Sequence, residues 1–373
     1  MIERMCLSDL IGDFIAYRNL EPPGARLRGL PAIRAELGLP AGRIPRKAEP
    51  EYAAVIAHLL RQAQSLRGAN AALERVLCIG DTRLNDRAAA ANLGRHFALR
   101  AFIGEDRLRD APELVTQGEF AFANRWALLD DFVRDVERQG FALDENTAVV
   151  MDVDKTLIGA RGRNDRPIDQ ARIDAACDIA RAALGDQFSM QAFRPIYDEL
   201  HKAIYHPFTG DNQDYLVYVA LMSSAGVYDF RALLGDLKEK RLATFEEFVA
   251  VCDGHMYNGS FAALQPIHSE VSSNLRRGDP TPFKSFRYRE YECTVARMDV
   301  LPDDAPRVSL LADEIVLTGE VARVARELRG RGALLMALSD KPDEASFPCT
   351  EAAAKGSLPL HRVTMKVISA EPL

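Results

Sequence analysis

The chain has 373 residues, of which 47% are apolar and 27% are charged, values close to the average for soluble globular proteins. This composition argues against a disordered, collagen-like or low-complexity chain, and the length indicates about two domains of ~150 residues each. Acidic residues (54) outnumber basic ones (47) and give a net charge of −7, whereas proteins that bind a nucleic-acid backbone usually carry a basic surplus.

Helices and strands alternate in the N-terminal part of the chain. Helical spacing of apolar residues, with breaks at proline or glycine, predicts helices over residues 8–18 (with Ser8 as its cap), 30–37, 49–65, 86–93 and 126–139. Continuous apolar runs predict buried strands over residues 75–80, 97–103 and 147–152. The last of these is the clearest strand, and a dense polar and glycine-rich segment follows it.

The C-terminal part begins with a long helical stretch, from about residue 168 to 304. A helix over 319–329, a strand over 332–339, a short helix over 351–355 and a last strand over 362–368 follow. Strands that are continuous apolar runs and alternate with helices favour an α/β fold, in which helices cover both faces of a parallel sheet. The helical stretch is the candidate second domain.

The sequence gives no sign of a membrane span or of a secretory signal. The longest wholly apolar stretches, such as 216–222, are far shorter than the ~20 residues that a membrane helix needs. The N-terminus lacks a basic region followed by an apolar core. No C-x-x-C pair joins the widely spaced cysteines, so we expect reduced thiols, a cytoplasmic protein and no membrane partner. The cysteines are Cys6, Cys78, Cys177, Cys252, Cys293 and Cys349.

The segment Asp152-Val-Asp154-Lys-Thr156 directly follows the clearest strand. The carboxyl edge of a parallel sheet is where ligands bind in open α/β folds. Two carboxylates two residues apart can then take different roles, one as nucleophile and metal ligand and the other as proton donor and acceptor. The alternative interpretation is a loop with solvated acids.

A second acidic segment, Gly80-Asp81 to Asp86, also follows an apolar strand. Glycine lets the backbone approach a ligand closely. Four carboxylates at one sheet edge repel one another unless a cation lies among them, and hard oxygen ligands suit Mg²⁺. Asp86 has an alternative role, which is to complement the dipole at a helix N-terminus.

Two further segments have the same kind of position. Ser339 follows an apolar strand, where a hydroxyl and adjacent backbone N–H groups can hold a phosphoryl oxygen, although an ordinary turn has the same composition. Lys47 begins the helix that leads to the strand before Asp81, and a lysine there can neutralise a phosphoryl group or a nucleophilic aspartate.

Together these residues resemble the four motifs of the haloacid dehalogenase-like (HAD) hydrolase superfamily. The D-x-D-x-T motif matches Asp152, Asp154 and Thr156, the second motif matches Ser339, and the third matches Lys47. The acidic fourth motif matches Asp81 and Asp86, although their spacing of five makes the role of Asp86 open. The resemblance covers residues 46–160 and 315–368. It implies a three-layer Rossmann-like parallel sheet with a large, mainly helical cap domain inserted after the first-motif strand.

The resemblance also implies a mechanism. Asp152 attacks phosphorus and forms an aspartyl-phosphate, and Asp154 protonates the leaving oxygen and then activates water. Family members that act on carbon–halogen bonds lack the second acid, so Asp154 favours phosphoryl chemistry. The implied cofactor is Mg²⁺, held by Asp152, Asp81 and the backbone carbonyl of Asp154. Asp86 is either a further acid of the metal site or the partner that positions Lys47.

The same resemblance gives Thr156 and Ser339 the role of orienting phosphoryl oxygens. Lys47 offsets charge on the nucleophile and on the transferring group. The expected enzyme is therefore a HAD-like phosphatase, that is, a phosphoric monoester hydrolase.

The order of the motifs departs from the family pattern, because the third and fourth precede the first and the second comes last. This order predicts a circularly permuted domain, in which strand 147–152 is central. Strands 75–80 and then 97–103 are expected on one side of it, with 332–339 and then 362–368 on the other, and residues 1–45 form an added helical arm. A tandem pair of domains is disfavoured, because D-x-D-x-T occurs once and no fourth motif follows Ser339.

The predicted boundaries are 1–160 for the N-terminal part of the core, 161–315 for the helical cap and 316–373 for the C-terminal part. A large cap favours a small phosphorylated substrate and disfavours a nucleic acid. Eight basic and aromatic residues of this region are candidates for contacting the leaving group, but each is expected to be a solvated surface residue, so all eight are left out of the predicted site. They are Arg161, Arg163, His201, Lys202, Tyr205, His206, Arg276 and Arg277.

Three other functions remain open at this stage. A phosphomutase needs the same acid pair, a nucleic-acid end phosphatase is disfavoured by the acidic balance, and a non-catalytic HAD-like binding protein is disfavoured by the complete acid set. The sequence identifies neither the substrate nor the oligomeric state.

Overall fold

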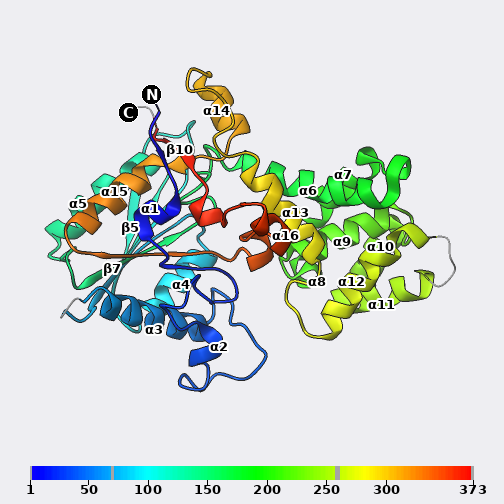
Figure 1. The fold of residues 1–373 in the computed structure, drawn as a ribbon, viewed down its shortest axis with the longest axis horizontal. Helices are drawn as coiled ribbons and strands as arrows, with labels where there is room; N and C mark the ends of the chain where they lie inside the picture. Colours follow the sequence, from blue (N-terminus) through cyan, green and yellow to red (C-terminus); the bar gives the residue numbers. More distant parts are fainter. Residues whose placement is uncertain (1, 69–70, 257–260, 371–373) are drawn as a thin grey trace. The chain divides into compact units, whose positions relative to one another are not determined.

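The computed structural model describes residues 2–68, 71–256 and 261–370. The chain forms two compact units (Figure 1). The first contains residues up to Gln170 and from Thr294 onward, and the second is Ala171–Cys293. No helix in the described ranges is both long enough and apolar enough to cross a membrane.

A mainly parallel sheet forms the centre of the first unit. Seven strands of the described chain build it, in the order β2-β9-β7-β3-β4-β6-β5. All neighbours are parallel except β5 and β6, which form an antiparallel hairpin. The strands are β2 (Ile15–Ala16), β3 (Arg75–Gly80), β4 (Ala98–Gly104), β5 (Leu114–Gln117), β6 (Phe120–Ala123), β7 (Thr147–Asp152) and β9 (Leu334–Leu338).

Strand β7 lies inside the sheet between β3 and β9, as predicted, and so joins strands from the two ends of the chain. Cys78 of β3 pairs with Val150 on one side, and Met336 of β9 pairs with Val150 on the other. Both ends of the chain therefore contribute to one sheet, and the separate sheets that a tandem pair requires are not formed. The prediction of an α/β fold with a mainly parallel sheet and a large helical region is confirmed.

The strand predicted over 362–368 was expected in the main sheet, beside the strand predicted over 332–339. It lies in a different sheet, so its predicted position is wrong. Its ordered part, β10 (Met365–Ile368), pairs with β1 (Arg4–Met5) and β8 (Leu317–Thr318). The place beside β9 is taken by β2, because the Phe14 and Ala16 carbonyls accept hydrogen bonds from the Ala337 and Ser339 N–H groups. Residues 1–45 thus supply an edge strand and are not merely an added helical arm.

Helices cover both faces of the main sheet, because alternate side chains of each buried strand point to opposite faces. Val149 and Met151 pack with α5 and α15, whereas Ala148 and Val150 pack with α3 and α4. The helices of the first unit are α1 (Leu7–Ile11), α2 (Leu30–Ile33), α3 (Pro50–Leu66), α4 (Asn85–Leu93), α5 (Leu129–Arg138), α14 (Arg307–Asp313), α15 (Gly319–Gly330) and α16 (Thr350–Ala354).

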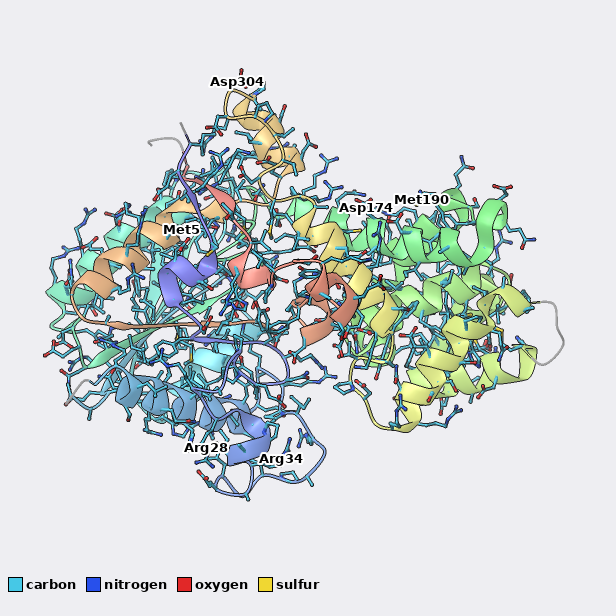
Figure 2. The ribbon with its side chains drawn as sticks, in the orientation of Figure 1. Met5, Arg28, Arg34, Asp174, Met190 and Asp304 are labelled. Atoms are coloured by element: carbon cyan, nitrogen blue, oxygen red, sulfur yellow. The ribbon has the colours of Figure 1, made fainter. Side chains whose placement is uncertain are left out.

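Two N-terminal helices are shorter than predicted. The helix expected over 8–18 ends at Ile11, where Gly12 takes a φ of +61° and redirects the chain into β2. The helix expected over 30–37 ends at Ile33. The next residue, Arg34 (labelled in Figure 2), donates hydrogen bonds to the Pro40 and Arg43 carbonyls. These bonds fold the segment that leads to Lys47.

The second unit is helical and has its own core. Residues 216–222 of α9 are apolar at every position, and each of them is at most 2% exposed. The predicted limits of the helical domain, 161–315, stay a prediction, and this unit lies within them. Its helices are α6 (Arg166–Leu184, which begins in the first unit), α7 (Met190–Leu200), α8 (His206–Thr209), α9 (Gln213–Ser224), α10 (Phe230–Lys238), α11 (Phe245–Met256), α12 (Gln265–Arg276) and α13 (Lys284–Val295, which ends in the first unit).

Candidate functional site

The candidate site lies at the carboxyl edge of the main sheet, where β3, β7 and β9 end side by side. Ile79 pairs with Met151, and Asp152 pairs with Leu338. Because these strands are parallel, the residues that follow them emerge at the same edge. Asp81, Asp152 and Ser339 are therefore brought to one place from segments far apart in the sequence.

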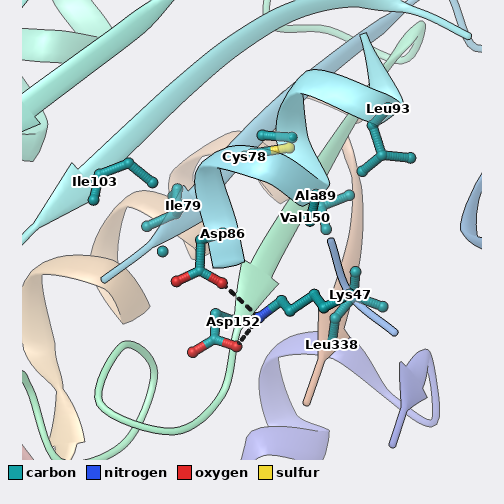
Figure 3. Close-up of a pocket in the computed structure, with 12 residues that line it drawn as sticks. Lys47, Cys78, Ile79, Asp86, Ala89, Leu93, Ile103, Val150, Asp152 and Leu338 are labelled. Atoms are coloured by element: carbon teal, nitrogen blue, oxygen red, sulfur yellow. Dashed lines mark hydrogen bonds and ion pairs between the residues drawn. The ribbon is translucent and has the colours of Figure 1, made fainter. Parts of the chain in front are cut away.

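Lys47 contacts two of the predicted acids. Its Nζ lies 2.5 Å from Oδ1 of Asp152 and 2.5 Å from Oδ1 of Asp86 (Figure 3). All three side chains are at most 10% exposed. The adjacent backbone is fixed, because Asn92 of α4 donates a 3.0 Å hydrogen bond to the carbonyl of Ala48. The lysine ammonium thus bridges the end of β7 and the segment that follows β3.

The methylene chain of Lys47 lines a small, largely apolar cavity of about 20 Å³, which has room for about one water molecule. Cys78, Ile103, Val150 and Leu338 are among its other lining residues (Figure 3). Little solvent can therefore screen the charge of the ammonium on this side, and its attraction to the two carboxylates is strengthened.

Asp86 is held by its own loop and by the absence of a side chain at Gly80. Its Oδ2 accepts hydrogen bonds from the N–H groups of Asp81 (3.0 Å) and Thr82 (2.8 Å) and from the Thr82 hydroxyl (2.8 Å). A Cβ at position 80 would lie only 2.6 Å from the Cβ of Asp86. Glycine is therefore required for this close approach, which aims the other oxygen of Asp86 at Lys47.

Asp81, Asp86 and Asp152 form the one acidic group among the described residues whose arrangement fits a metal ion. Each offers a carboxylate oxygen, and these oxygens lie within 4.8 Å of one another. That spread is close to the ~4.2 Å that separates opposite ligands of a Mg²⁺ ion with ~2.1 Å bonds. Asp81 also contacts Arg161 through the guanidinium Nε. The donor set consists of hard oxygens and fits Mg²⁺.

The charges of this cluster are not balanced by its bases. Burial opposes the charge of Lys47, but Asp152 and Asp86 outweigh it and hold the lysine pKa well above its usual value. Burial disfavours the Asp86 charge as well, yet Lys47 keeps the pKa of Asp86 below normal. Burial raises the pKa of Asp152 well above normal despite Lys47. Burial and Asp86 raise the pKa of Asp81 to about 7, with Arg161 opposing the shift. An additional cation would favour ionisation of both raised acids.

The remaining predicted residues lie around this cluster. Oδ2 of Asp154 is 3.4 Å from Nζ of Lys341, whose side chain is 2% exposed. The Ser339 hydroxyl is buried and accepts a 3.0 Å hydrogen bond from the N–H of Lys341. Thr156 is fully buried, and no described residue hydrogen-bonds to its hydroxyl. The structure therefore brings Lys47, Asp81, Asp86 and Asp152 into one cluster and gives Asp154 a separate lysine partner.

The loop after β7, residues 153–165, is fixed by buried polar contacts. Arg163 pairs with Asp106 (2.6 Å) and Glu320 (2.9 Å), and its side chain is 6% exposed. Asn164 is fully buried and donates hydrogen bonds to the carbonyls of Leu311 and Glu314. Arg163 thus has a structural role here, whereas Arg161 of the same loop reaches the acidic cluster.

Arg161 and Lys341 are the site residues that sequence reasoning did not select. Lys341 lies two residues after Ser339, and Arg161 lies in the polar segment after the first motif, so both had a positional signal. Nothing in the sequence distinguishes Arg161 from Arg163, because the direction of each side chain depends on tertiary contacts. Comparisons of the chain with protein-family models, curated proteins and solved structures find no match.

Proposed function

We propose that the protein is a Mg²⁺-dependent phosphohydrolase of the HAD-like type, with a circularly permuted chain, that acts on a small phosphorylated metabolite. The observation that carries the proposal is the bridge from Lys47 to Asp86 and Asp152, with Asp81 beside it. These four residues come from three separate segments of the sequence, each of which resembles a motif of that family.

In this proposal the carboxylate of Asp152 attacks phosphorus, and the bond from phosphorus to the leaving oxygen breaks. Asp154 gives its proton to that oxygen, so the first product leaves as an alcohol. Asp154, now ionised, takes a proton from water as the water oxygen attacks the aspartyl-phosphate. The bond between phosphorus and Asp152 then breaks, and inorganic phosphate is released.

Lys47 reduces the repulsion between Asp152 and the anionic substrate, because its ammonium already contacts the nucleophile. Asp86 positions the Lys47 ammonium through its Oδ1 atom, which contacts Nζ of the lysine. Asp81, Asp152 and the backbone carbonyl of Asp154 would hold Mg²⁺, with Asp86 beside them. When bound, this ion supplies positive charge that stabilises the phosphoryl oxygens. Thr156 and Ser339 would orient those oxygens.

The helical insertion between the two halves of the core is the proposed cap. An insertion after the first-motif strand is where a family cap is expected, and the second unit has a core of its own. A cap favours a small substrate, because a closed site excludes large ones. This part of the proposal rests on the resemblance and on the position of the insertion.

The proposal is tested by measuring phosphate release from a panel of small phosphomonoesters, namely sugar phosphates, phosphorylated amino acids and nucleoside monophosphates. We expect release from at least one class in Mg²⁺ and none in EDTA. Release that EDTA leaves unchanged would contradict the metal-dependent mechanism. No release from any class, by folded protein that binds Mg²⁺, would contradict a hydrolase that acts on these substrates.

A further inference from the structure

The contact between Arg161 and Asp81 has no role in the proposed phosphohydrolase mechanism. Lys47 serves Asp86 and Asp152, so Arg161 is the cation that faces the third acid of the cluster. The side chain of Asp81 is 3% exposed, whereas that of Arg161 is 32% exposed. A partly solvated cation thus covers a buried carboxylate that is also a proposed metal ligand.

The backbone of Arg161 is held in place. Its N–H donates to the carbonyl of Lys155 (2.9 Å), and its carbonyl accepts from the N–H of Asp106 (2.9 Å) and from Nε1 of Trp126 (3.3 Å). Gly162 has a φ of +78°, and a Cβ there would lie 2.1 Å from the carbonyl oxygen of Asp106. Any change at Arg161 is therefore confined to its side chain, which is partly exposed to solvent.

The guanidinium contacts Asp81 through Nε alone. No described residue hydrogen-bonds to its two terminal nitrogens, which leaves their four N–H groups for another acceptor. A guanidinium and a divalent cation on one carboxylate repel each other, and this repulsion is strong at a poorly solvated site. A phosphoryl group, by contrast, suits the planar donors of arginine.

We infer that Arg161 is an exchangeable counter-ion. It pairs with Asp81 in the metal-free protein, leaves that carboxylate when Mg²⁺ binds there, and then donates to an oxygen of the phosphoryl group. The inference rests on the proposed function, because it takes Asp81 as a metal ligand. It assigns Arg161 two opposite effects, since the residue weakens Mg²⁺ binding to the empty site and strengthens the binding of the phosphoryl anion.

The test is a calorimetric titration of the full-length protein with Mg²⁺ alone, followed by titration of the Mg²⁺-saturated protein with inorganic phosphate. For Arg161→Gln we expect Mg²⁺ to bind about tenfold more tightly and phosphate about tenfold more weakly, the size of one charged hydrogen bond. Arg134→Gln, which removes an exposed arginine of α5, is the control for net charge and should match the wild type in both titrations.

Arg161→Lys provides a second variant that keeps the charge but lacks the planar donors. It should lie nearer to the wild type than Arg161→Gln does in Mg²⁺ affinity. Mg²⁺ binding that is unchanged or weaker in folded Arg161→Gln overturns the exchange, and unchanged phosphate binding overturns the contact with the anion.

Asp81→Asn separates this inference from the proposed function. If Mg²⁺ binds to Asp81→Asn as tightly as to the wild type, the proposed metal site is contradicted. If Mg²⁺ binds to neither protein, the proposed metal site is contradicted as well. If Asp81→Asn loses Mg²⁺ while Arg161→Gln behaves as the wild type, only the exchange fails.

Discussion

Both units of the molecule bury charged side chains, but they do so differently. In the helical unit Arg287 contacts Asp214 (2.6 Å) and Glu290 (2.7 Å), and Glu290 also contacts Arg172 (3.0 Å). In these contacts each acid has an arginine partner, and two acids meet two bases. At the sheet edge, four acids face the three bases Lys47, Arg161 and Lys341.

The difference teaches which buried charges point to chemistry. A balanced cluster inside a helical core satisfies itself and needs no ligand. The cluster at the strand ends keeps an excess of carboxylate. Burial, with a smaller contribution from neighbouring carboxylates, raises the pKa of Asp81 and of Asp152. Burial also raises the pKa of Asp214 in the helical cluster, so the raised pKa values alone do not distinguish the two clusters. The excess and the position at the carboxyl edge, rather than burial alone, support the proposed function.

The largest expected effect is at Asp152. Asp152→Asn should reduce phosphate release more than about 10⁴-fold, because a neutral amide is not a nucleophile. The melting temperature should stay the same or rise, because a repelling carboxylate is removed. Asp131→Asn, an exposed acid of α5, is the matched control and should keep full activity. Unchanged turnover in Asp152→Asn would rule out the mechanism.

Asp154→Asn should lower turnover by roughly 10²–10⁴-fold, the usual contribution of general acid–base catalysis. Mg²⁺ affinity should stay close to the wild-type value, because the proposed ligand is the backbone carbonyl of this residue. Turnover and calorimetry on the same preparation separate the two effects. A large loss of Mg²⁺ affinity would show that the side chain itself is needed for the metal.

Substitutions in the charged cluster of the helical unit should change the free energy of unfolding. Arg287→Met leaves two buried acids without this partner and should lower the free energy of unfolding by about 3–5 kcal/mol. Arg194→Met removes an exposed ion pair with Asp198 and should cost at most about 1 kcal/mol. Chemical denaturation measures both. Equal effects of the two substitutions would contradict the structural role of the buried cluster.

The raised pKa of Asp81, about 7, predicts a pH dependence of stability in metal-free buffer. An acid whose pKa is higher in the folded chain than in the unfolded one takes up a proton on folding. Its contribution is therefore greatest below pH 4 and is lost as the pH rises from about 4 to 7, by on the order of 3 kcal/mol. Denaturation of the wild type and Asp81→Asn across this range isolates the contribution, and parallel curves would contradict it.

The smallest effect concerns the turn that holds Asp86. Gly80→Ala places a Cβ against that side chain and should cost about 1–3 kcal/mol of stability. Gly235→Ala in α10 meets no atom within 4 Å and should be neutral or stabilise the protein by up to about 1 kcal/mol. Thermal denaturation distinguishes them, and a neutral Gly80→Ala would show that the turn adapts.

The sequence by itself determined the strong local elements. Strands β3 and β7 occupy the predicted residues, because continuous apolar runs bounded by polar turns have few alternatives to a buried parallel strand. Their order and central position followed from the motifs. The proximity of Lys47, Asp86 and Asp152 followed as well, since parallel strands end at one edge.

Only the tertiary structure decided the edges and the side-chain partners. The two-residue strand β2 has no periodicity to detect, and it joins β9 because its carbonyls meet unpaired N–H groups there. β10 lies in a second sheet for the same reason, because its backbone groups pair there with those of β8. Arg161 reaches Asp81 while Arg163 is buried against Asp106 and Glu320, and this choice depends on where the loop is anchored. Local sequence patterns determine which element forms and which of its faces is buried. Which strand pairs at the edge of a sheet depends on the backbone groups that the tertiary fold brings within hydrogen-bonding distance.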